Sequence, residues 1–213
     1  MKIILLGAPG AGKGTQAENI SGQYSIPTIS TGNMIRAAIH QGTELGKQAE
    51  SLINAGKFVS DEIVIDMIRE RLGEADCAKG FILDGFPRNI PQAKALEAMG
   101  ISIDMVLSLE VADEKIVQRL GGRRVCPACG MTYHVDFKPS EDNKHCDACM
   151  AELIIRKDDH PDTVQQRLNI YHETTEPLKA YYKAQGKLVS VEGQEELAET
   201  TKSTFEAVEA YKK

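Results

Sequence analysis

A glycine-rich segment near the N-terminus carries the strongest chemical signal in this sequence. It reads GAPGAGKGT over residues 7–15 and follows the apolar run Lys2–Leu6, which predicts a buried strand. Glycines let backbone N–H groups turn inward around phosphate oxygens, and a following helix adds the positive end of its dipole. The pattern G-x-x-x-x-G-K, ending at Lys13, therefore indicates a phosphate-binding loop. Lys13 is expected to bridge the β- and γ-phosphates of a nucleotide.

The residue after Lys13 departs from the usual pattern. Serine or threonine normally follows the lysine and binds Mg²⁺, whereas this chain has Gly14 there and Thr15 one position later. We therefore expect Mg²⁺ to be held largely through phosphates and water. A glycine-rich turn that binds nothing is the alternative, and the flanking strand and helix argue against it.

A second signal lies in FILDGFPRNIPQ, residues 81–92. Asp84 ends an apolar strand, where a carboxylate can hold water around Mg²⁺. Gly85 and Pro87 shape the turn, and Arg88 is expected to project beside the phosphate loop. An acidic strand end followed by an ordinary turn is the alternative interpretation.

Four of the five cysteines lie close together. Cys126, Cys129, Cys146 and Cys149 form two C-x-x-C pairs separated by sixteen residues. This spacing predicts a tetrahedral metal site, usually Zn²⁺, and four thiolates leave no position for water, as in structural sites. Iron and a pair of disulfides are the alternatives. Cys77 lies apart in a polar stretch and is interpreted as an unpaired thiol.

Composition limits the function classes. The chain of 213 residues has a net charge of -6 and a pI near 5.5, which disfavours general binding to nucleic acid or to anionic membranes. The apolar run before Gly7 is too short for a signal peptide, so we expect a cytoplasmic protein with reduced cysteines. The five histidines are interpreted as surface or packing residues. If the fold gathers the scattered arginines, they make an anion site; they are Arg36, Arg88, Arg119, Arg123, Arg124, Arg156 and Arg167.

The pattern of elements predicts an α/β fold with a central parallel sheet covered by helices. Expected strands are Lys2–Leu6, Thr28–Ser30, Phe81–Leu83, Met105–Val111 and Leu188–Val191. Expected helices are Thr15–Tyr24, Asp61–Leu72, Pro91–Met99, Asp113–Leu120, Thr163–Ala184 and Glu195–Tyr211. Two stretches interrupt this rhythm, namely 30–59, which Gly32, Gly42, Gly46 and Gly56 punctuate, and 122–159. Both are expected to be insertions onto a core of residues 1–29, 60–121 and 160–213.

The motifs GAPGAGKGT, STGNMIR, DGFPR, GRR and RKDD…R occur in this order. Together they resemble bacterial adenylate kinase of the long-lid form over essentially the whole chain. The resemblance implies a monomeric enzyme with a P-loop kinase core, a helical AMP-binding insertion at 30–59 and a zinc-binding lid at 122–159. It implies reversible phosphoryl transfer between ATP, with Mg²⁺, and AMP to give two ADP, with lid closure excluding water.

The resemblance also implies roles for individual residues. For AMP binding these are Thr31, Arg36, Lys57, Phe58, Val59, Gly85, Phe86, Pro87, Arg88, Gln92, Arg156 and Arg167, with Gln92 on the adenine edge. For ATP binding they are Gly10, Ala11, Gly12, Lys13, Gly14, Thr15, Arg119, Arg123, Thr132, Tyr133 and Glu195. Catalysis is expected to depend on Lys13, Arg88, Arg123, Arg156, Arg167 and Asp84.

One position departs from the family pattern. Asn33 stands where STGDM is usual, which removes a negative charge beside Arg36 and predicts altered local pairing without loss of activity. Three alternative functions remain open at this point: a kinase of another nucleoside monophosphate, a non-enzymatic nucleotide switch, and a zinc-finger module that binds nucleic acid. Acidic residues outnumber basic ones in the cysteine-rich stretch, which disfavours the last.

Overall fold

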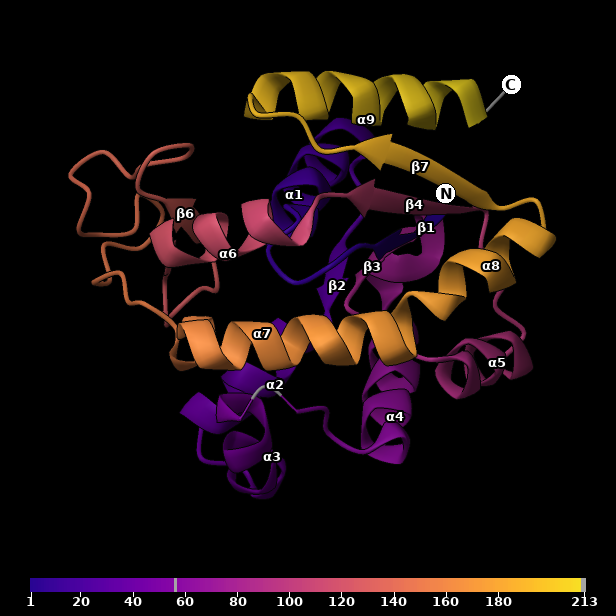
Figure 1. Cartoon of the computed structure of the whole chain (residues 1–213). Coiled ribbons are helices and arrows are strands. Elements are labelled where there is room, and N and C mark those ends of the chain that lie inside the picture. Colours follow the sequence, from indigo (N-terminus) through magenta and orange to yellow (C-terminus); the bar gives the residue numbers. More distant parts are fainter. Residues whose placement is uncertain (56, 212–213) are drawn as a thin grey trace.

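The computed structural model describes residues 1–55 and 57–211. A parallel sheet of five strands forms its centre, in the order β2-β3-β1-β4-β7 (Figure 1). The strands are β1 (Lys2–Leu6), β2 (Thr28–Ser30), β3 (Phe81–Asp84), β4 (Met105–Glu110) and β7 (Leu188–Glu192). Since β1 lies between β3 and β4, the phosphate loop that follows β1 emerges from the middle of the sheet. The predicted parallel α/β fold is confirmed.

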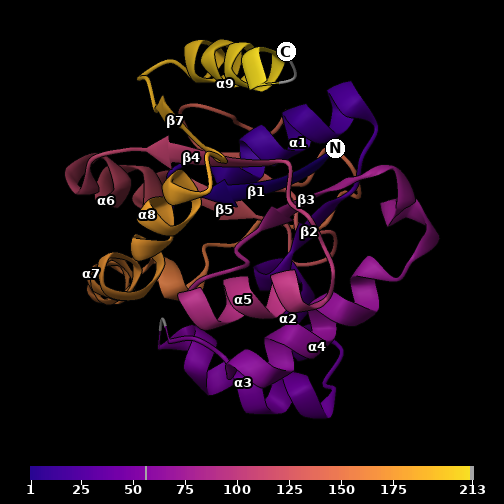
Figure 2. The same cartoon turned by 90° about the vertical axis from the view of Figure 1, so that its right-hand side faces the viewer.

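Helices cover both faces of the sheet because side chains alternate along each buried strand. Ile3 and Leu5 of β1 pack into one core, and Ile4 and Leu6 pack into the other. The first core is completed by α1 (Lys13–Tyr24), α6 (Asp113–Gly122), α7 (Pro161–Ile170) and α9 (Leu197–Tyr211). The second is completed by α4 (Asp61–Leu72), α5 (Ile90–Ala98) and α8 (Pro177–Ala184); Figure 2 shows α1 and α9 across the sheet from α4 and α5.

The stretch 30–59 contains two helices that pack tightly. They are α2 (Thr31–His40) and α3 (Glu44–Asn54), which lie together below the sheet in Figure 1. A Cβ atom at Gly46 would lie 2.1 Å from the Ala38 carbonyl oxygen, so only glycine permits this approach. Gly56, one of the punctuating glycines, lies outside the described residues.

Residues 122–159, called here the cysteine-rich segment, form a small unit with its own core. The strands β5 (Arg123–Val125) and β6 (Thr132–His134) pair antiparallel, and a short 3₁₀ turn, η2 (Lys157–Asp159), ends the segment. Cys126, Tyr133 and Cys146 form its buried centre. The division of the chain into core, insertion and lid remains a prediction.

The structure differs from the local expectations at several points, among them the start of α1, which lies at Lys13 and not at Thr15. The helix expected over 163–184 is divided into α7 and α8 by a π-helical turn, η3 (Tyr171–Thr175), and α8 begins at Pro177, whose ring removes a backbone donor. Helix α9 begins at Leu197, two residues later than expected. Cys77 is a free thiol, as expected, but it lies in the short 3₁₀ helix η1 (Ala75–Lys79) and not in an exposed loop. It is buried beside Arg71, whose Nη1 lies 3.1 Å from its sulfur. Among the described residues, no helix is both long and apolar enough to cross a membrane.

Candidate active site

A cavity of about 670 Å³ opens at the carboxyl ends of β1, β2 and β3, where ligands bind in open α/β sheets. Its size is typical of a small-molecule site. Ten lysine and arginine side chains line it against four acidic ones, although the whole chain carries a net charge of -6. The described part of the chain therefore concentrates its positive charge in one place, and the cavity suits a polyanion.

The phosphate loop forms one wall of this cavity. Gly10 and Gly12 have φ angles of 86° and 97°, in the left-handed region that favours glycine, and α1 begins immediately afterwards at Lys13. The Lys13 ammonium donates hydrogen bonds to the carbonyl oxygens of Gly7 and Ala8, at 2.7 and 2.8 Å. The lysine is thus held across its own loop, at the N-terminal end of the helix dipole.

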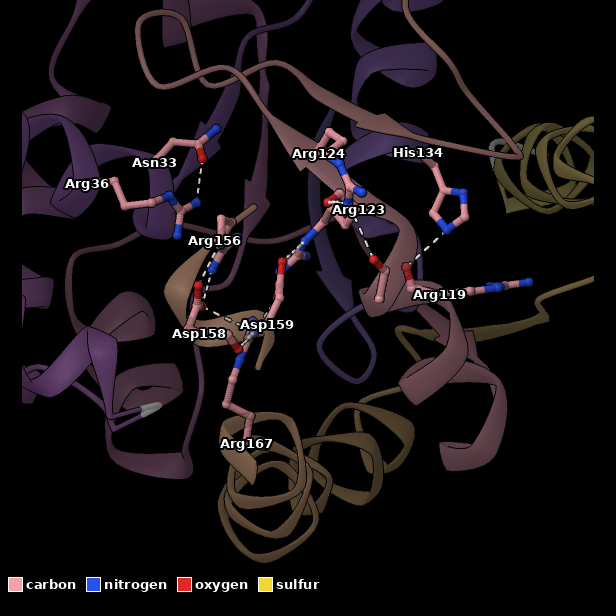
Figure 3. Close-up of polar contacts among 11 residues, drawn as sticks. Asn33, Arg36, Arg119, Arg123, Arg124, His134, Arg156, Asp158, Asp159 and Arg167 are labelled. Atoms are coloured by element: carbon pink, nitrogen blue, oxygen red, sulfur yellow. Dashed lines mark hydrogen bonds and ion pairs between the residues drawn. The ribbon is translucent and has the colours of Figure 1, made fainter. Parts of the chain in front are cut away.

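Three arginines form a second wall, and two buried aspartates organise them (Figure 3). Asp159 accepts hydrogen bonds from Arg123, with Nε at 2.7 Å, and from Arg167, with Nη1 at 3.0 Å. Asp158 pairs in the same way with Arg156, whose Nε lies at 2.8 Å, and with Arg167. The two carboxylates thus hold three guanidinium groups that line the cavity, and a planar guanidinium has five N–H donors, more than these pairings use.

The 30–59 stretch and the turn after β3 supply further cations of the cavity. Arg36 donates a hydrogen bond to the side-chain oxygen of Asn33 (Figure 3), and burial together with the charge of Arg156 in the cysteine-rich segment lowers the Arg36 pKa. Arg88 donates from Nε to the Gly85 carbonyl oxygen at 2.8 Å and lies 4.7 Å from the centre of the Phe58 ring. Asn33 thus retains a pairing with Arg36 although it carries no charge.

The cations of the cavity are not fully neutralised. Burial lowers the pKa of Lys13 to about 8, and burial, together with neighbouring arginines, lowers the pKa values of Arg36, Arg88, Arg123 and Arg167. A lowered pKa in a cationic group means that its charged form costs free energy in this environment. An anion in the cavity would remove that cost, so the cluster is preorganised for phosphate.

At the opposite end, the segment after β7 forms part of the wall. Arg119 donates a hydrogen bond to the Gln194 carbonyl oxygen at 2.8 Å, and Thr132 and Glu195 also line the cavity. Sequence reasoning missed His134, whose Nε2 lies 3.0 Å from the Arg119 carbonyl oxygen and whose ring lines the same end (Figure 3). Nothing in the spacing of His134 signals this contact, which depends on the fold of the cysteine-rich segment.

The structure brings together the cationic residues that the sequence singled out, except Arg124, which does not line the cavity and is bonded to backbone carbonyl oxygens. It also places some expected AMP contacts behind the wall. Val59 and Phe86 are buried in the apolar core. Thr31 is buried and donates to the Gly85 carbonyl oxygen at 2.8 Å, and the buried Gln92 side chain is bonded to Asp61 and to the Arg88 backbone. Lining residues expected from the sequence are Gly10 to Thr15, Arg36, Lys57, Phe58, Asp84, Gly85, Pro87, Arg88, Arg119, Arg123, Thr132, Tyr133, Arg156, Arg167 and Glu195.

Comparison with known proteins agrees with this geometry. The adenylate kinase family model matches residues 5–187. A protein of Caldicellulosiruptor bescii named adenylate kinase is 52% identical over 212 residues, covering 98% of this chain and 99% of the relative. One of the same name from Lachnospira eligens is 54% identical over 197 residues, covering 91% and 92% of the two chains, and one from Acetivibrio thermocellus is 48% identical over 216 residues, covering 100% of both.

The chain belongs to the adenylate kinase family. It is thus an enzyme of the kinase and transferase class that binds nucleotides. Membership of this family explains the surplus of cationic side chains in the cavity. Phosphoryl transfer between nucleotides requires two polyanions to be held together with their charge neutralised.

Within this adenylate kinase, the cysteine-rich segment brings its four cysteines to one point. The Sγ atoms of Cys126, Cys129, Cys146 and Cys149 lie within 4.8 Å of one another, with Cys126 to Cys149 at 3.4 Å and Cys129 to Cys146 at 3.5 Å. All are free cysteines and not disulfides. A tetrahedral Zn²⁺ with Zn–S bonds of about 2.3 Å separates its sulfur ligands by roughly 3.8 Å, so the cluster fits the ion. Contact with the Tyr133 hydroxyl lowers the pKa of Cys146, whereas burial raises that of Cys129, so the ion would have to displace thiol protons when it binds.

Loss of one of these thiols is expected to affect stability more than chemistry. Cys129→Ser should lower the metal content well below one equivalent and the stability by on the order of 3 kcal/mol, a part of the metal's binding free energy. For a chain of this size the melting temperature then falls by roughly 6–12 °C. Metal analysis and thermal unfolding test this, with Cys77→Ser as a thiol-to-hydroxyl control outside the cluster. Unchanged metal content in the Cys129 variant would contradict the assigned ligand set.

Proposed function

We propose that this chain catalyses the reversible transfer of a phosphoryl group from ATP to AMP, giving two ADP. The proposal is supported above all by one cationic cavity, which is lined by the phosphate loop together with Arg36 and Arg88. Two phosphate chains that enter from opposite ends would meet between these groups, tail to tail.

The ATP half is proposed to lie between the phosphate loop and the segment after β7. Backbone N–H groups of Gly10 to Thr15 would cradle the phosphates, with Lys13 and Arg123 on the transferring end. Arg119, Thr132, Tyr133 and Glu195 would contact the rest of the nucleotide. Mg²⁺, which neutralises phosphate charge, would be carried with ATP, and Asp84 at the end of β3 is the carboxylate proposed to hold its water.

The AMP half is proposed to lie against the 30–59 stretch and the turn after β3. Arg36 and Arg88 would bind the AMP phosphate, and Arg156 and Arg167 would reach both that phosphate and the transferring group. Gln92 would recognise the adenine edge, with Thr31, Lys57 to Val59 and Gly85 to Pro87 around the nucleotide. The attacking oxygen of AMP is already ionised near neutral pH, so this chemistry needs no general base.

Water must be kept away because it competes with AMP as acceptor. We propose that the cysteine-rich segment is a lid that closes over the nucleotides and reopens to release product. Two contacts support this role: Lys138 of the segment lies 2.6 Å from Glu18 of α1, and a Cβ atom at Gly130 would lie 3.2 Å from the Asn33 side chain. The segment therefore reaches both the ATP side and the AMP side. We also propose a monomer in the reducing cytoplasm, where four zinc-bound thiolates persist.

A coupled assay with ATP and each nucleoside monophosphate in turn tests this function. AMP is expected to be the preferred acceptor, by at least about tenfold in kcat/KM, a transition-state difference of about 1.4 kcal/mol. Preference for another monophosphate would replace AMP as the substrate, and the absence of transfer to every monophosphate would refute the kinase proposal. A salt-dependent shift of an oligonucleotide would instead favour the nucleic-acid-binding alternative.

A further inference from the structure

A hydrogen-bonded network outside the cavity connects the first residue of α4 to the backbone of Arg88. Asp61, where the chain leaves the 30–59 stretch and α4 begins, accepts a hydrogen bond from Gln92 Nε2 at 2.7 Å. It also accepts from Asn89 Nδ2, at 2.9 and 3.1 Å from its two oxygens. Asp61 lies in α4 and Gln92 in α5, and these two helices pack against each other (Figures 1 and 2).

Backbone groups fix the orientation of both side-chain amides. The Arg88 N–H donates to Gln92 Oε1 at 2.7 Å, and the Gln92 N–H donates to Asn89 Oδ1 at 2.9 Å. A backbone N–H can only donate, so each amide must turn its oxygen toward it and its NH₂ group the other way. Both NH₂ groups therefore converge on residue 61.

Only a group that accepts from both sides satisfies this arrangement. The Asp61 carboxylate does so, because an ionised carboxylate is purely an acceptor. An asparagine of the same shape does not: with its oxygen toward Gln92, its NH₂ group faces that of Asn89, and with the amide reversed it faces that of Gln92. Turning Gln92 in response would set its NH₂ group against the Arg88 N–H. One donor–donor contact remains in every case.

The network ends on the residue that the proposed function assigns to the AMP phosphate. The Arg88 N–H is held by Gln92, and the Arg88 carbonyl oxygen accepts from the Thr175 hydroxyl at 2.8 Å. Both backbone groups of Arg88 are thus fixed, one of them through Gln92 and Asp61. A shift of Gln92 would move Arg88 and with it the group that binds phosphate.

We propose that Asp61 is a positioning residue for the monophosphate half of the site, acting through the oriented side-chain amide of Gln92 on Arg88. This inference rests on the proposed function, since it assigns Asp61 to the AMP half. Asp61 does not line the cavity, so it is not expected to touch either nucleotide. Its carboxylate holds Gln92, and through it Arg88, in place before AMP binds. Loss of the carboxylate should therefore weaken AMP binding and leave ATP binding unchanged.

Steady-state kinetics of Asp61→Asn tests the inference. The KM for AMP is expected to rise about tenfold, while kcat and the KM for ATP stay within about twofold of the wild type, because only preorganisation of the AMP half is lost. Asp61→Glu, which keeps two acceptor oxygens, should lie nearer the wild type. Glu62→Gln is the matched control, since it removes the neighbouring charge in the same first turn of α4 from an exposed position.

The outcomes separate this inference from the proposed function. A wild-type protein without AMP-dependent ADP formation refutes the function itself. An active wild type whose Asp61→Asn variant keeps its KM for AMP, or loses AMP and ATP affinity equally, refutes the positioning role alone. Titration of the Asp61→Asn variant with ATP shows whether it is folded. If it does not fold, Asp61→Ala is used in its place, because water can replace both acceptor oxygens there. The same criterion then applies, namely a raised KM for AMP with an unchanged KM for ATP.

Discussion

Replacing Lys13 with alanine is expected to lower kcat by on the order of 10³-fold, the scale of losing a preorganised charge at a phosphoryl-transfer centre. Lys13 Nζ lies across the phosphate loop between the Gly7 and Ala8 carbonyl oxygens. Its ammonium is buried in a cavity with a surplus of positive charge, so it is available to neutralise charge that moves between two phosphates. Lys13 is the only lysine in the loop of residues 7–15, all of which the structure describes, so no second lysine of the loop can replace it.

The same substitution should not destabilise the free protein. Burial lowers the Lys13 pKa from 10.5 to about 8, so in the folded state its charged form is disfavoured relative to the unfolded chain. This cost is fully present below pH 8 and disappears as the pH rises toward 10.5. Removing Lys13 should therefore leave stability at pH 7 equal or higher while activity is lost.

Single-turnover kinetics and thermal unfolding at pH 7 measure the two effects separately. Lys94→Ala, which changes an exposed lysine on α5, serves as the control for loss of a lysine elsewhere. If the Lys13 variant transferred the phosphoryl group at a rate within about tenfold of the wild type, Lys13 would not have the catalytic role assigned to it.

Replacing Arg88 with alanine is expected to raise the KM for AMP by on the order of 10²-fold, because charge-assisted hydrogen bonds to phosphate are worth about 1.5–3 kcal/mol each. Arg88 is held by the Gly85 carbonyl oxygen, by the face of Phe58 and by its own backbone contacts, so its guanidinium is presented to the AMP side in a fixed direction. ATP affinity should change by less than about threefold, since the loop wall is formed by other residues.

Binding measurements with each nucleotide alone distinguish this from general damage. Arg88→Lys keeps the charge but not the planar fork, and should recover only part of the AMP affinity. Arg69→Ala, at an exposed position on α4 paired with Asp66, controls for the loss of an arginine. Equal losses of ATP and AMP affinity in the Arg88 variant would contradict the division of the cavity into two halves.

Local sequence patterns predicted those features that depend on local geometry. The phosphate loop, the end of β3 at Asp84 and the metal spacing of the cysteines each require only a short stretch of chain to form. Strand β1 was predicted with its correct bounds because four consecutive apolar residues follow Lys2 and Gly7 ends the run. The signal that divides 163–184 was also present, since Pro177 lies inside the expected helix, but the helical periodicity on both sides concealed the π-helical turn.

Long-range contacts could not be predicted from the sequence. Asp158 and Asp159 belong to the motif RKDD…R, but nothing in the sequence indicates that Asp159 pairs with Arg123, which lies 36 positions earlier in the chain. The pairing of Asp61 with Gln92 spans 31 positions. His134 reaches the cavity wall, and Cys77 is buried, only because of tertiary packing. The resemblance identified the arginines of the site. The structure adds that Asp158 and Asp159 hold three of them in the wall of one cavity.

Counting the adenine nucleotides bound to the protein tests the central claim, that one cationic cavity holds two nucleotides at once. Equilibrium dialysis with Mg²⁺ and saturating ADP gives the total nucleotide bound per chain, which is unaffected if ADP is converted to ATP and AMP during the measurement. Two molecules per chain are expected in the wild type, with one of the two weakened in Arg88→Ala. A single bound nucleotide at saturation would contradict the account.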